Sequence, residues 1–112
     1  MNRWALTGLL LLVSVPAWAA QNILTWTDNS TNELSFNIER KAEACTGTLA
    51  FAPLASVGTN ITTYTDSAVV EGVTYCYRVN ASNTAGVSTY SNTASRTVPF
   101  TIPATPSGLG VN

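Results

Sequence analysis

The sequence contains no histidine and few charged residues. Of its 112 residues, only five are Lys or Arg and six are Asp or Glu. Without an imidazole, neither a Ser-His-Asp triad nor a Cys-His pair can be assembled. The six carboxylates stand mostly in turn sequences or at alternating polar positions, where we expect them to be solvated rather than paired as in a glycosidase. We therefore predict that the protein is not an enzyme and uses no cofactor or metal.

The shortage of basic side chains also restricts the partners. The formal net charge is −1, and the basic residues form no cluster in the sequence. Nucleic-acid binding needs a basic patch that displaces counterions from phosphates, and attraction to an anionic membrane surface needs a polybasic segment. We therefore expect no nucleic acid and no membrane surface among the partners.

Long hydrophobic runs are missing except near the N-terminus. Residues 1–20 combine a basic Arg3, an apolar stretch over 5–15 and the small-x-small pattern Ala17-Trp18-Ala19. These are the three parts of an export signal. The stretch stops at Pro16, short of the roughly 20 apolar residues that a membrane-spanning helix needs. A retained anchor is the alternative, but we predict a cleaved signal peptide and a secreted, periplasmic or cell-surface protein with no membrane segment after cleavage.

Cysteine occurs only twice, at Cys45 and Cys76. Two thiols without histidine make a poor zinc site, because structural zinc takes four such ligands. An exported chain meets an oxidising compartment, so we predict that Cys45 and Cys76 form a disulfide.

Apolar and polar residues alternate with a period of two over much of the chain. The clearest example surrounds Cys76, where Tyr75, Tyr77 and Val79 fall on one face and Cys76 and Arg78 on the other. This pattern indicates a half-buried strand. Further strands are predicted at 23–27, 34–41, 51–57, 61–65 and 90–98, with Pro53 placing 51–57 at a sheet edge. No segment has a helical period, so the chain is predicted to be an all-β sandwich.

The segment between the first two predicted strands has two interpretations. Residues 28–33 read Asp-Asn-Ser-Thr-Asn-Glu and carry side-chain oxygens at nearly every position. A calcium loop uses such oxygens, but it also requires a glycine at its sharp bend, and none is present. We favour an ordinary loop whose side chains cap its own backbone.

Five short motifs follow one another in the sequence. They are Leu24-x-Trp26, Phe36-x-Ile38-x-Arg40, Tyr64-x-Asp66, Gly72-x-Thr74-Tyr75-x-Tyr77-Arg78-Val79 and Tyr90-Ser91-Asn92. In this order they resemble a bacterial secreted fibronectin type III domain over about residues 23–98, and we place the domain at 21–98. The resemblance implies a sandwich with the core anchors Trp26, Phe36, Ile38, Tyr64, Tyr75, Tyr77 and Val79. It also implies that Tyr75 is the corner tyrosine, whose hydroxyl returns to the backbone just upstream.

The chain departs from this family at both ends. The resemblance implies a strand A ahead of the strand that holds Trp26, yet the predicted mature chain starts almost directly at that strand. The C-terminal residues 99–112 are rich in Pro and Gly and form an extended tail that cannot be helical. Within the tail, Leu109-Gly110-Val111 looks like the opening of a strand A, so Leu109 and Val111 are candidate strand donors.

Three arrangements of the tail stay open. It can complete a neighbouring copy by strand addition, fold back onto its own domain, or remain an unpaired linker. Donation to the next copy is a contact that does not close on itself and therefore builds fibres.

We predict an exported, non-catalytic structural or protein-interaction module that can assemble head to tail with copies of itself. The alternative is an accessory carbohydrate-binding or adhesion module with a polysaccharide partner. For that alternative, Tyr90 and Phe100 are the candidate exposed rings. Alternation and the resemblance place Trp26, Phe36, Tyr64, Tyr75 and Tyr77 in the core.

Overall fold

The computed structural model describes residues 20–112. Most of the predicted export signal, residues 1–19, lies outside this range. The regular elements that the range contains are all strands. No helix within it is long and apolar enough to cross a membrane.

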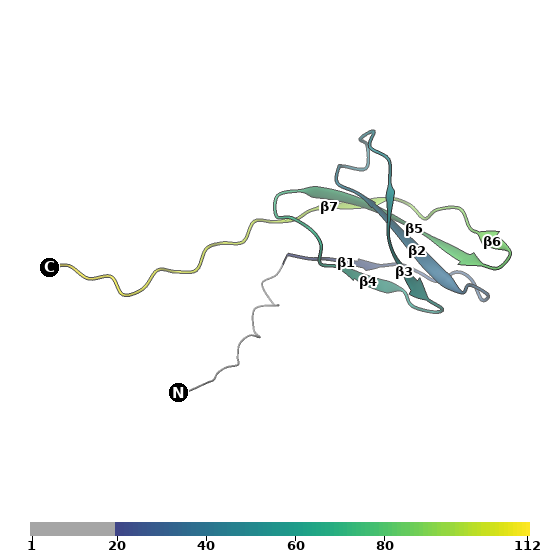
Figure 1. The fold of residues 1–112 in the computed structure, drawn as a ribbon, viewed down its shortest axis with the longest axis horizontal. Coiled ribbons are helices and arrows are strands. Elements are labelled where there is room, and N and C mark those ends of the chain that lie inside the picture. The colour runs from purple at the N-terminus through teal and green to yellow at the C-terminus, as the bar shows by residue number, and fades with distance from the viewer. Residues whose placement is uncertain (1–19) are drawn as a thin grey trace, which may run out of the picture.

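The strands form two antiparallel sheets that pack as a sandwich (Figure 1). In chain order they are β1 Asn22–Thr25, β2 Ser35–Lys41, β3 Ala52–Gly58, β4 Thr63–Asp66, β5 Thr74–Asn83, β6 Gly86–Val87 and β7 Ala94–Thr97. The small sheet contains only β1 and β4, and the large sheet has the order β3-β2-β5-β6, with β7 also paired to β5. Within residues 20–112 no strand precedes β1, so the small sheet lacks a strand A.

The core lies between the sheets and is supplied mainly by alternate residues of β2 and β5. Its buried members are Phe36, Ile38, Val69, Tyr75, Tyr77, Val79 and Val98. Two of the predicted anchors, Trp26 and Tyr64, are half-buried and pack against this cluster from the small sheet. Trp26 meets Phe36 edge to face, with 5.7 Å between the ring centroids. The hydroxyl of Tyr75 accepts a hydrogen bond of 2.9 Å from the backbone N–H of Val70, just upstream, as the family resemblance implied.

The predicted strand at 90–98 is wrong in its extent. The structure has the short β6 and β7, with the irregular segment 88–93 between them. In this segment the Oγ atoms of Ser88 and Ser91 accept the N–H groups of Ala81 and Val79 at 2.9 and 3.0 Å. The backbone N–H groups of both serines donate to the carbonyl oxygens of the same two β5 residues. The serine hydroxyls thus accept the β5 N–H groups that the backbone carbonyls of a neighbouring strand would otherwise accept. Serine and threonine also occur in regular strands, so the sequence does not reveal this arrangement.

The loop 28–33 is held by its own side chains and by the turn that follows β3. Glu33, expected to be solvated, is only 4% exposed. Its carboxylate accepts the Ser30 hydroxyl at 2.6 Å and the Asn60 N–H at 3.0 Å, and these bonds lower the pKa of Glu33 to about 2. Within residues 20–112 no group of three or more His, Cys, Asp or Glu side chains is placed to hold a metal ion.

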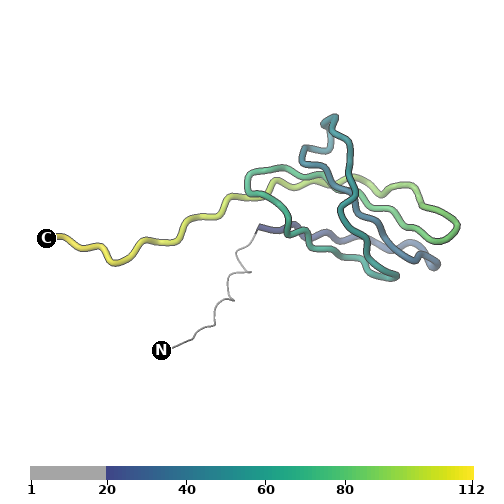
Figure 2. Tube along the Cα trace, viewed as in Figure 1, coloured from purple at the N-terminus to yellow at the C-terminus, as the bar shows by residue number. Residues whose placement is uncertain are grey.

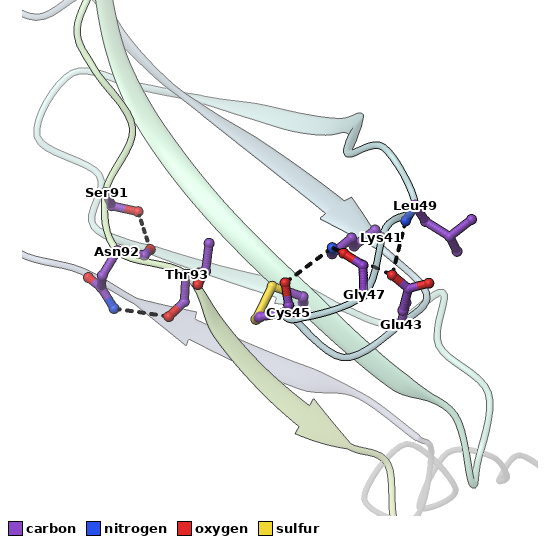
Figure 3. The surroundings of a disulfide bond; sticks show 9 residues. Lys41, Glu43, Cys45, Gly47, Leu49, Ser91, Asn92 and Thr93 are labelled. Atoms are coloured by element: carbon purple, nitrogen blue, oxygen red, sulfur yellow. Dashed lines mark hydrogen bonds and ion pairs between the residues drawn. A yellow bond between two sulfur atoms is a disulfide. The ribbon is translucent and has the colours of Figure 1, made fainter.

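The predicted disulfide between Cys45 and Cys76 is confirmed, with 5.1 Å between the two Cα atoms. It lies on the outer face of β5 and fixes the connection between β2 and β3 against that face (Figure 3). Lys41 supports the same connection, because its ammonium group donates to the carbonyl oxygens of Gly47 and Cys45 at 2.8 and 3.3 Å. Cys76 is completely buried beneath it.

Replacing both cysteines by alanine should destabilise the domain strongly. The bond spans a sequence separation of 31 residues, for which the chain-entropy model gives about 3.5 kcal/mol of stabilisation at 25 °C. Equilibrium urea unfolding of the double variant Cys45→Ala with Cys76→Ala, compared with the oxidised parent, measures this loss. A loss below about 1 kcal/mol would show that the constraint on the unfolded chain contributes little.

Candidate functional site

Among the strands of residues 20–112, β1 is paired on one edge only. Its partner is β4, with Leu24 opposite Tyr64, and the backbone N–H of Trp26 continues the pairing by donating to Thr62 at 3.1 Å. Backbone groups of successive strand residues point to opposite edges. The even-numbered residues of β1 therefore face β4, whereas Ile23 and Thr25 present their N–H and C=O groups to the open edge.

A groove follows this open edge between β1 and the strands β5 and β7. One part has a volume of about 760 Å³. It is bounded on one side by Leu24 of β1 and the adjoining Trp26, and on the other by Val79 of β5 and Ser91 of the segment 88–93. A second part of about 400 Å³ shares Trp26, Val79 and Ser91 with the first and continues to Tyr90. We call the two parts together the edge groove. It occupies the side of the sandwich on which the small sheet has no strand.

Trp26 is the clearest sign that this side of the core is incomplete. The side chain is only half-buried, although it belongs to the core cluster by its contacts. Its indole Nε1 is out of reach of water and has no hydrogen-bond partner within the described residues. Buried polar atoms are rarely left in this state. The Trp26 side chain is therefore partly exposed, and its N–H lacks a hydrogen-bond acceptor.

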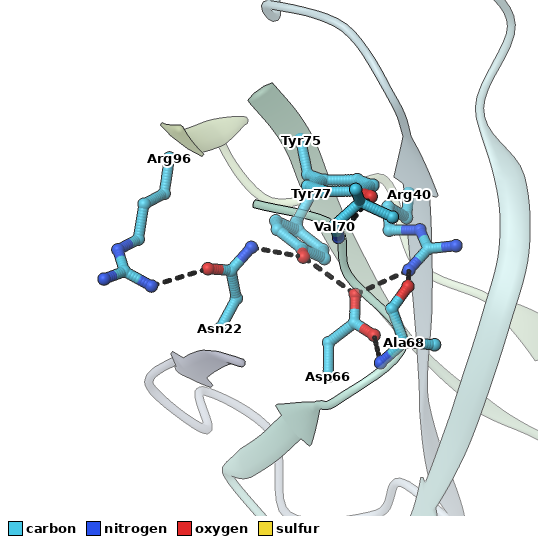
Figure 4. A network of polar contacts seen from close by, with 8 residues as sticks. All are labelled: Asn22, Arg40, Asp66, Ala68, Val70, Tyr75, Tyr77 and Arg96. Carbon is cyan, nitrogen blue, oxygen red and sulfur yellow. Dashed lines mark hydrogen bonds and ion pairs between the residues drawn. The ribbon is translucent and has the colours of Figure 1, made fainter. Parts of the chain in front are cut away.

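A chain of polar contacts crosses one end of the edge groove (Figure 4). A single nitrogen of Arg96, in β7, donates to the carbonyl oxygen of Gln21 at 2.9 Å and to the side-chain oxygen of Asn22 at 2.8 Å. The amide nitrogen of Asn22 donates to the Tyr77 hydroxyl, which donates to Asp66, both at 2.8 Å. These bonds join β7, β1, β5 and β4 at the end of the groove where β1 begins.

Asp66 is the buried centre of this chain of contacts and is only 1% exposed, contrary to the expectation that the carboxylates are solvated. Arg40 pairs with it at 2.8 Å and also donates to the carbonyl oxygen of Ala68. Burial raises the pKa of the Tyr77 phenol to about 12, and the hydrogen bond and charge of Asp66 act in the same direction. The phenol is consequently a neutral donor at any ordinary pH.

The two rings that the sequence offered for sugar stacking already have partners in the domain. The Cζ atom of Arg78 lies 3.7 Å from the centroid of the Tyr90 ring and 4.2 Å from that of the Phe51 ring. Phe100 covers Gly72, which has a positive φ of 83°, so closely that an added Cβ would collide with the ring. Both aromatic side chains therefore pack against the domain, although Tyr90 is still 43% exposed and Phe100 77% exposed.

The first residues of the tail are fixed to the sandwich by hydrogen bonds between Thr101 and Glu71. The N–H and hydroxyl of Thr101 donate to the Glu71 carboxylate at 3.1 and 2.6 Å, which lowers the pKa of Glu71. Beyond this point the chain runs away from the sandwich (Figure 2). Leu109 and Val111 are 95% and 93% exposed. The structure therefore does not bring these two residues to the edge groove of their own domain.

Comparison with solved structures identifies the fold. The sixth fibronectin type III domain of human fibronectin type III domain containing protein 3 matches with a TM-score of 0.59 and 17% identity, over 79% of this chain and 81% of that one. The fold is that of a fibronectin type III domain. A myokine structure matches with a TM-score of 0.54 and 19% identity, over 73% of this chain and 85% of that one.

The twitchin kinase region from C. elegans also matches this fibronectin type III fold. The TM-score is 0.59 and the identity 26%, over 72% of this chain but only 14% of the twitchin chain. No family model matches the sequence, and no curated protein matches it either. The similarity therefore lies in the three-dimensional arrangement of the strands.

Two residues that shape the site were not singled out from the sequence. Asn22 and Arg96 lie 74 positions apart, and each occurs in a segment of unremarkable polar composition. Nothing in the sequence around Arg96 or Asn22 indicates that their side chains form a hydrogen bond, because only the fold brings the two strands together. The sequence predicted that no strand A precedes β1, and residues 20–112 contain none, but the contacts that close the groove at one end were not predicted.

Replacing Tyr77 by phenylalanine should destabilise the domain by about 1–3 kcal/mol, because Asp66 and Asn22 would each lose a hydrogen-bond partner in a buried site. Urea unfolding at neutral pH measures the effect. Tyr64→Phe is the matched control, since the Tyr64 hydroxyl takes no part in these contacts. Equal losses in the two variants would contradict a structural role for the Tyr77 hydroxyl.

The raised pKa of Tyr77 also predicts an alkaline loss of stability. The value is about 12 in the folded protein against 10 for an unperturbed tyrosine, so the unfolded chain releases this proton first. The contribution is complete below pH 10 and declines as the pH rises toward 12. Free energies of unfolding measured across this range should fall less steeply in Tyr77→Phe than in the parent, and identical slopes would contradict the assignment.

Proposed function

We propose that the protein is an exported, non-catalytic interaction module that accepts an added β-strand at the open edge of β1. The observation that carries this proposal is the free backbone of Ile23 and Thr25 beside the partly apolar edge groove. Fibronectin type III domains commonly serve protein interaction, which supports the general class. The export-signal pattern of residues 1–20 and the Cys45–Cys76 disulfide both support a secreted, periplasmic or cell-surface location.

Strand addition is the interaction that fits this site. A free edge offers a row of donors and acceptors to another extended chain, and folded proteins normally cover or blunt such an edge. In β-augmentation the backbone bonds give affinity, while pockets beside the edge select alternate side chains of the added strand. Here Leu24 and Trp26 line such a pocket. A partner that is extended and apolar at alternate positions is therefore favoured.

We further propose that the donor is the tail of another copy. Residues 99–112 would form a linker and donor segment outside the domain at 21–98, with Leu109 and Val111 as its alternate apolar residues. The six residues from Ile102 to Ser107 span at most about 20 Å when extended, so a donating copy would lie end to end with the accepting copy. Each copy would donate to one neighbour and accept from another, which gives an open fibre.

A carbohydrate-binding or adhesion function is less favoured. It depended on Tyr90 and Phe100 as free platforms. Both rings are exposed, but Tyr90 stacks on Arg78 and Phe100 packs over Gly72, so each has a partner within the domain. No observation of the site favours a polysaccharide over an extended peptide.

Charges at the two inward donor positions should abolish assembly. We expect the full chain, exported and processed by its host, to form multimers, and the variant Leu109→Asp with Val111→Asp to be a monomer, because burying two carboxylates in an apolar groove is costly. Light scattering after size-exclusion chromatography, together with electron microscopy, gives the mass and shape. The matched control, Gly110→Asp with Asn112→Asp, places the same charges at the alternate positions and should still assemble.

Two outcomes separate the parts of this proposal. If the parent chain is already a monomer at every concentration, self-assembly is wrong. A synthetic peptide of residues 103–112 should bind the Leu109→Asp, Val111→Asp variant and raise its melting temperature. Failure of this peptide to bind, together with a monomeric parent, would remove the tail as a donor and leave an acceptor for strands of other proteins.

A further inference from the structure

We infer that the added strand has one polarity and one register: the tail of a second copy enters the edge groove at its Asn29 end, runs antiparallel to β1 and pairs Gly110 with Thr25. This inference rests on the proposed function and specifies how the partner binds. It follows from the difference between the two ends of the groove and from the side chains that β1 directs into it.

The end of the groove at Gln21 is bridged. Arg96 reaches from β7 to the carbonyl oxygen of Gln21, at 2.9 Å, and to the Asn22 side chain. Asn22 is itself 3% exposed and bonded to the buried Tyr77 hydroxyl. A strand that entered here would have to break these bonds and leave buried polar groups without partners.

The opposite end of the groove is open. Its second part extends past Trp26 and Asn29 to Thr89 and Tyr90. Within the described residues, no hydrogen bond joins the segment 26–29 to the segment 88–91. A strand that enters here runs from Asn29 toward Asn22, which is opposite to the direction of β1. Antiparallel pairing is also slightly more stable per residue than parallel pairing.

The side chains of β1 select the register. Leu24 and Trp26 point into the groove and are half-buried, whereas Ile23 points outward and is 63% exposed. In antiparallel pairs, residues directly opposite each other place their side chains on the same face. Both apolar residues of the donor are accommodated when Leu109 lies opposite Trp26 and Val111 lies opposite Leu24.

This register also uses the free backbone of β1. It places Gly110 opposite Thr25 and Asn112 opposite Ile23, so these two pairs exchange the N–H and C=O groups that the open edge presents. A slip by one residue would turn Leu109 and Val111 to the solvent side.

Slips by two residues keep the correct face but lose other contacts. In one direction Leu109 moves opposite Asp28 and leaves Leu24 uncovered. In the other direction Val111 moves opposite the buried Asn22, whose side chain is held by Arg96 and Tyr77. Neither alternative places an apolar donor residue opposite both Leu24 and Trp26.

Polarity decides whether the assembly closes. The tail leaves the domain beside the bridged end, because β7 leads into it and Arg96 of β7 contacts Gln21. Insertion through the open end of a neighbour joins unlike ends and gives an open chain. Insertion through the bridged end would join like ends, and two copies could exchange tails reciprocally in a closed dimer.

Cysteine pairs test the register and the polarity together. Thr25→Cys with Gly110→Cys, in the full processed chain, should give a ladder of disulfide-linked multimers on a non-reducing gel, and reduction should remove it. Mixing the two single variants should link one copy of each. The offset pair Thr25→Cys with Gly108→Cys is the matched control and should lose most of this cross-linking, because its partners lie on a diagonal of the ladder.

Each other outcome contradicts one part of the inference, namely the polarity, the donor or the register. A product that stops at two copies overturns the antiparallel polarity, and a fast-migrating monomer with an internal link overturns the second copy as donor. Absence of cross-linking, while Leu109→Asp with Val111→Asp still dissociates the multimers, overturns the register but leaves the proposed function intact. Failure of the proposed function itself is recognised separately, as a parent chain that never forms multimers.

Discussion

The hydrogen bond from the Tyr77 hydroxyl to the Asp66 carboxylate joins the two sheets at the end where β1 begins. A two-stranded sheet has little stability of its own, so β1 and β4 depend on what fastens them to the large sheet. Asn22 extends the bond to β1, and Arg40 extends it to β2. This polar chain holds β1 in place although one of its edges is unpaired, and the edge groove exists because β1 stays there.

The parts of the fold that the sequence predicted are those with a local physical signal. Period-two alternation identified the core-facing residues of β5, and the compartment argument identified the Cys45–Cys76 pair. The prediction that β5 is half-buried was wrong, because Cys76 and Asn80 on its other face are buried too. The segment 88–93 could not be predicted, because serine hydroxyls can stand in for backbone carbonyls without any change in the alternation. The burial of Asp66 and Glu33 was missed for a related reason. Asp66 is bonded by Tyr77 and Arg40, and Glu33 is bonded by Asn60 as well as by the nearby Ser30, so most of these partners stand far away in the sequence.

The candidate site was partly visible in the same way. The predicted lack of a strand A ahead of the Trp26 strand and the alternation of Leu109 and Val111 can both be read from the linear sequence, and together they suggested strand donation. The direction of the donor strand is not a linear feature. It depends on Arg96 meeting Gln21, a contact across 75 positions that only the folded chain creates.

The anchored root of the tail has a mechanical consequence. Phe100 and Thr101 are fixed to the turn before β5, and a docked donor strand would be fixed from Gly108 onward. The segment 102–107 would then be the flexible linker between the donating domain and the accepting domain. Pro103 and Pro106 restrict that segment further, since proline-rich linkers behave as semi-rigid spacers. The bending stiffness and helical twist of a fibre built this way would be set by six residues rather than by the sandwich.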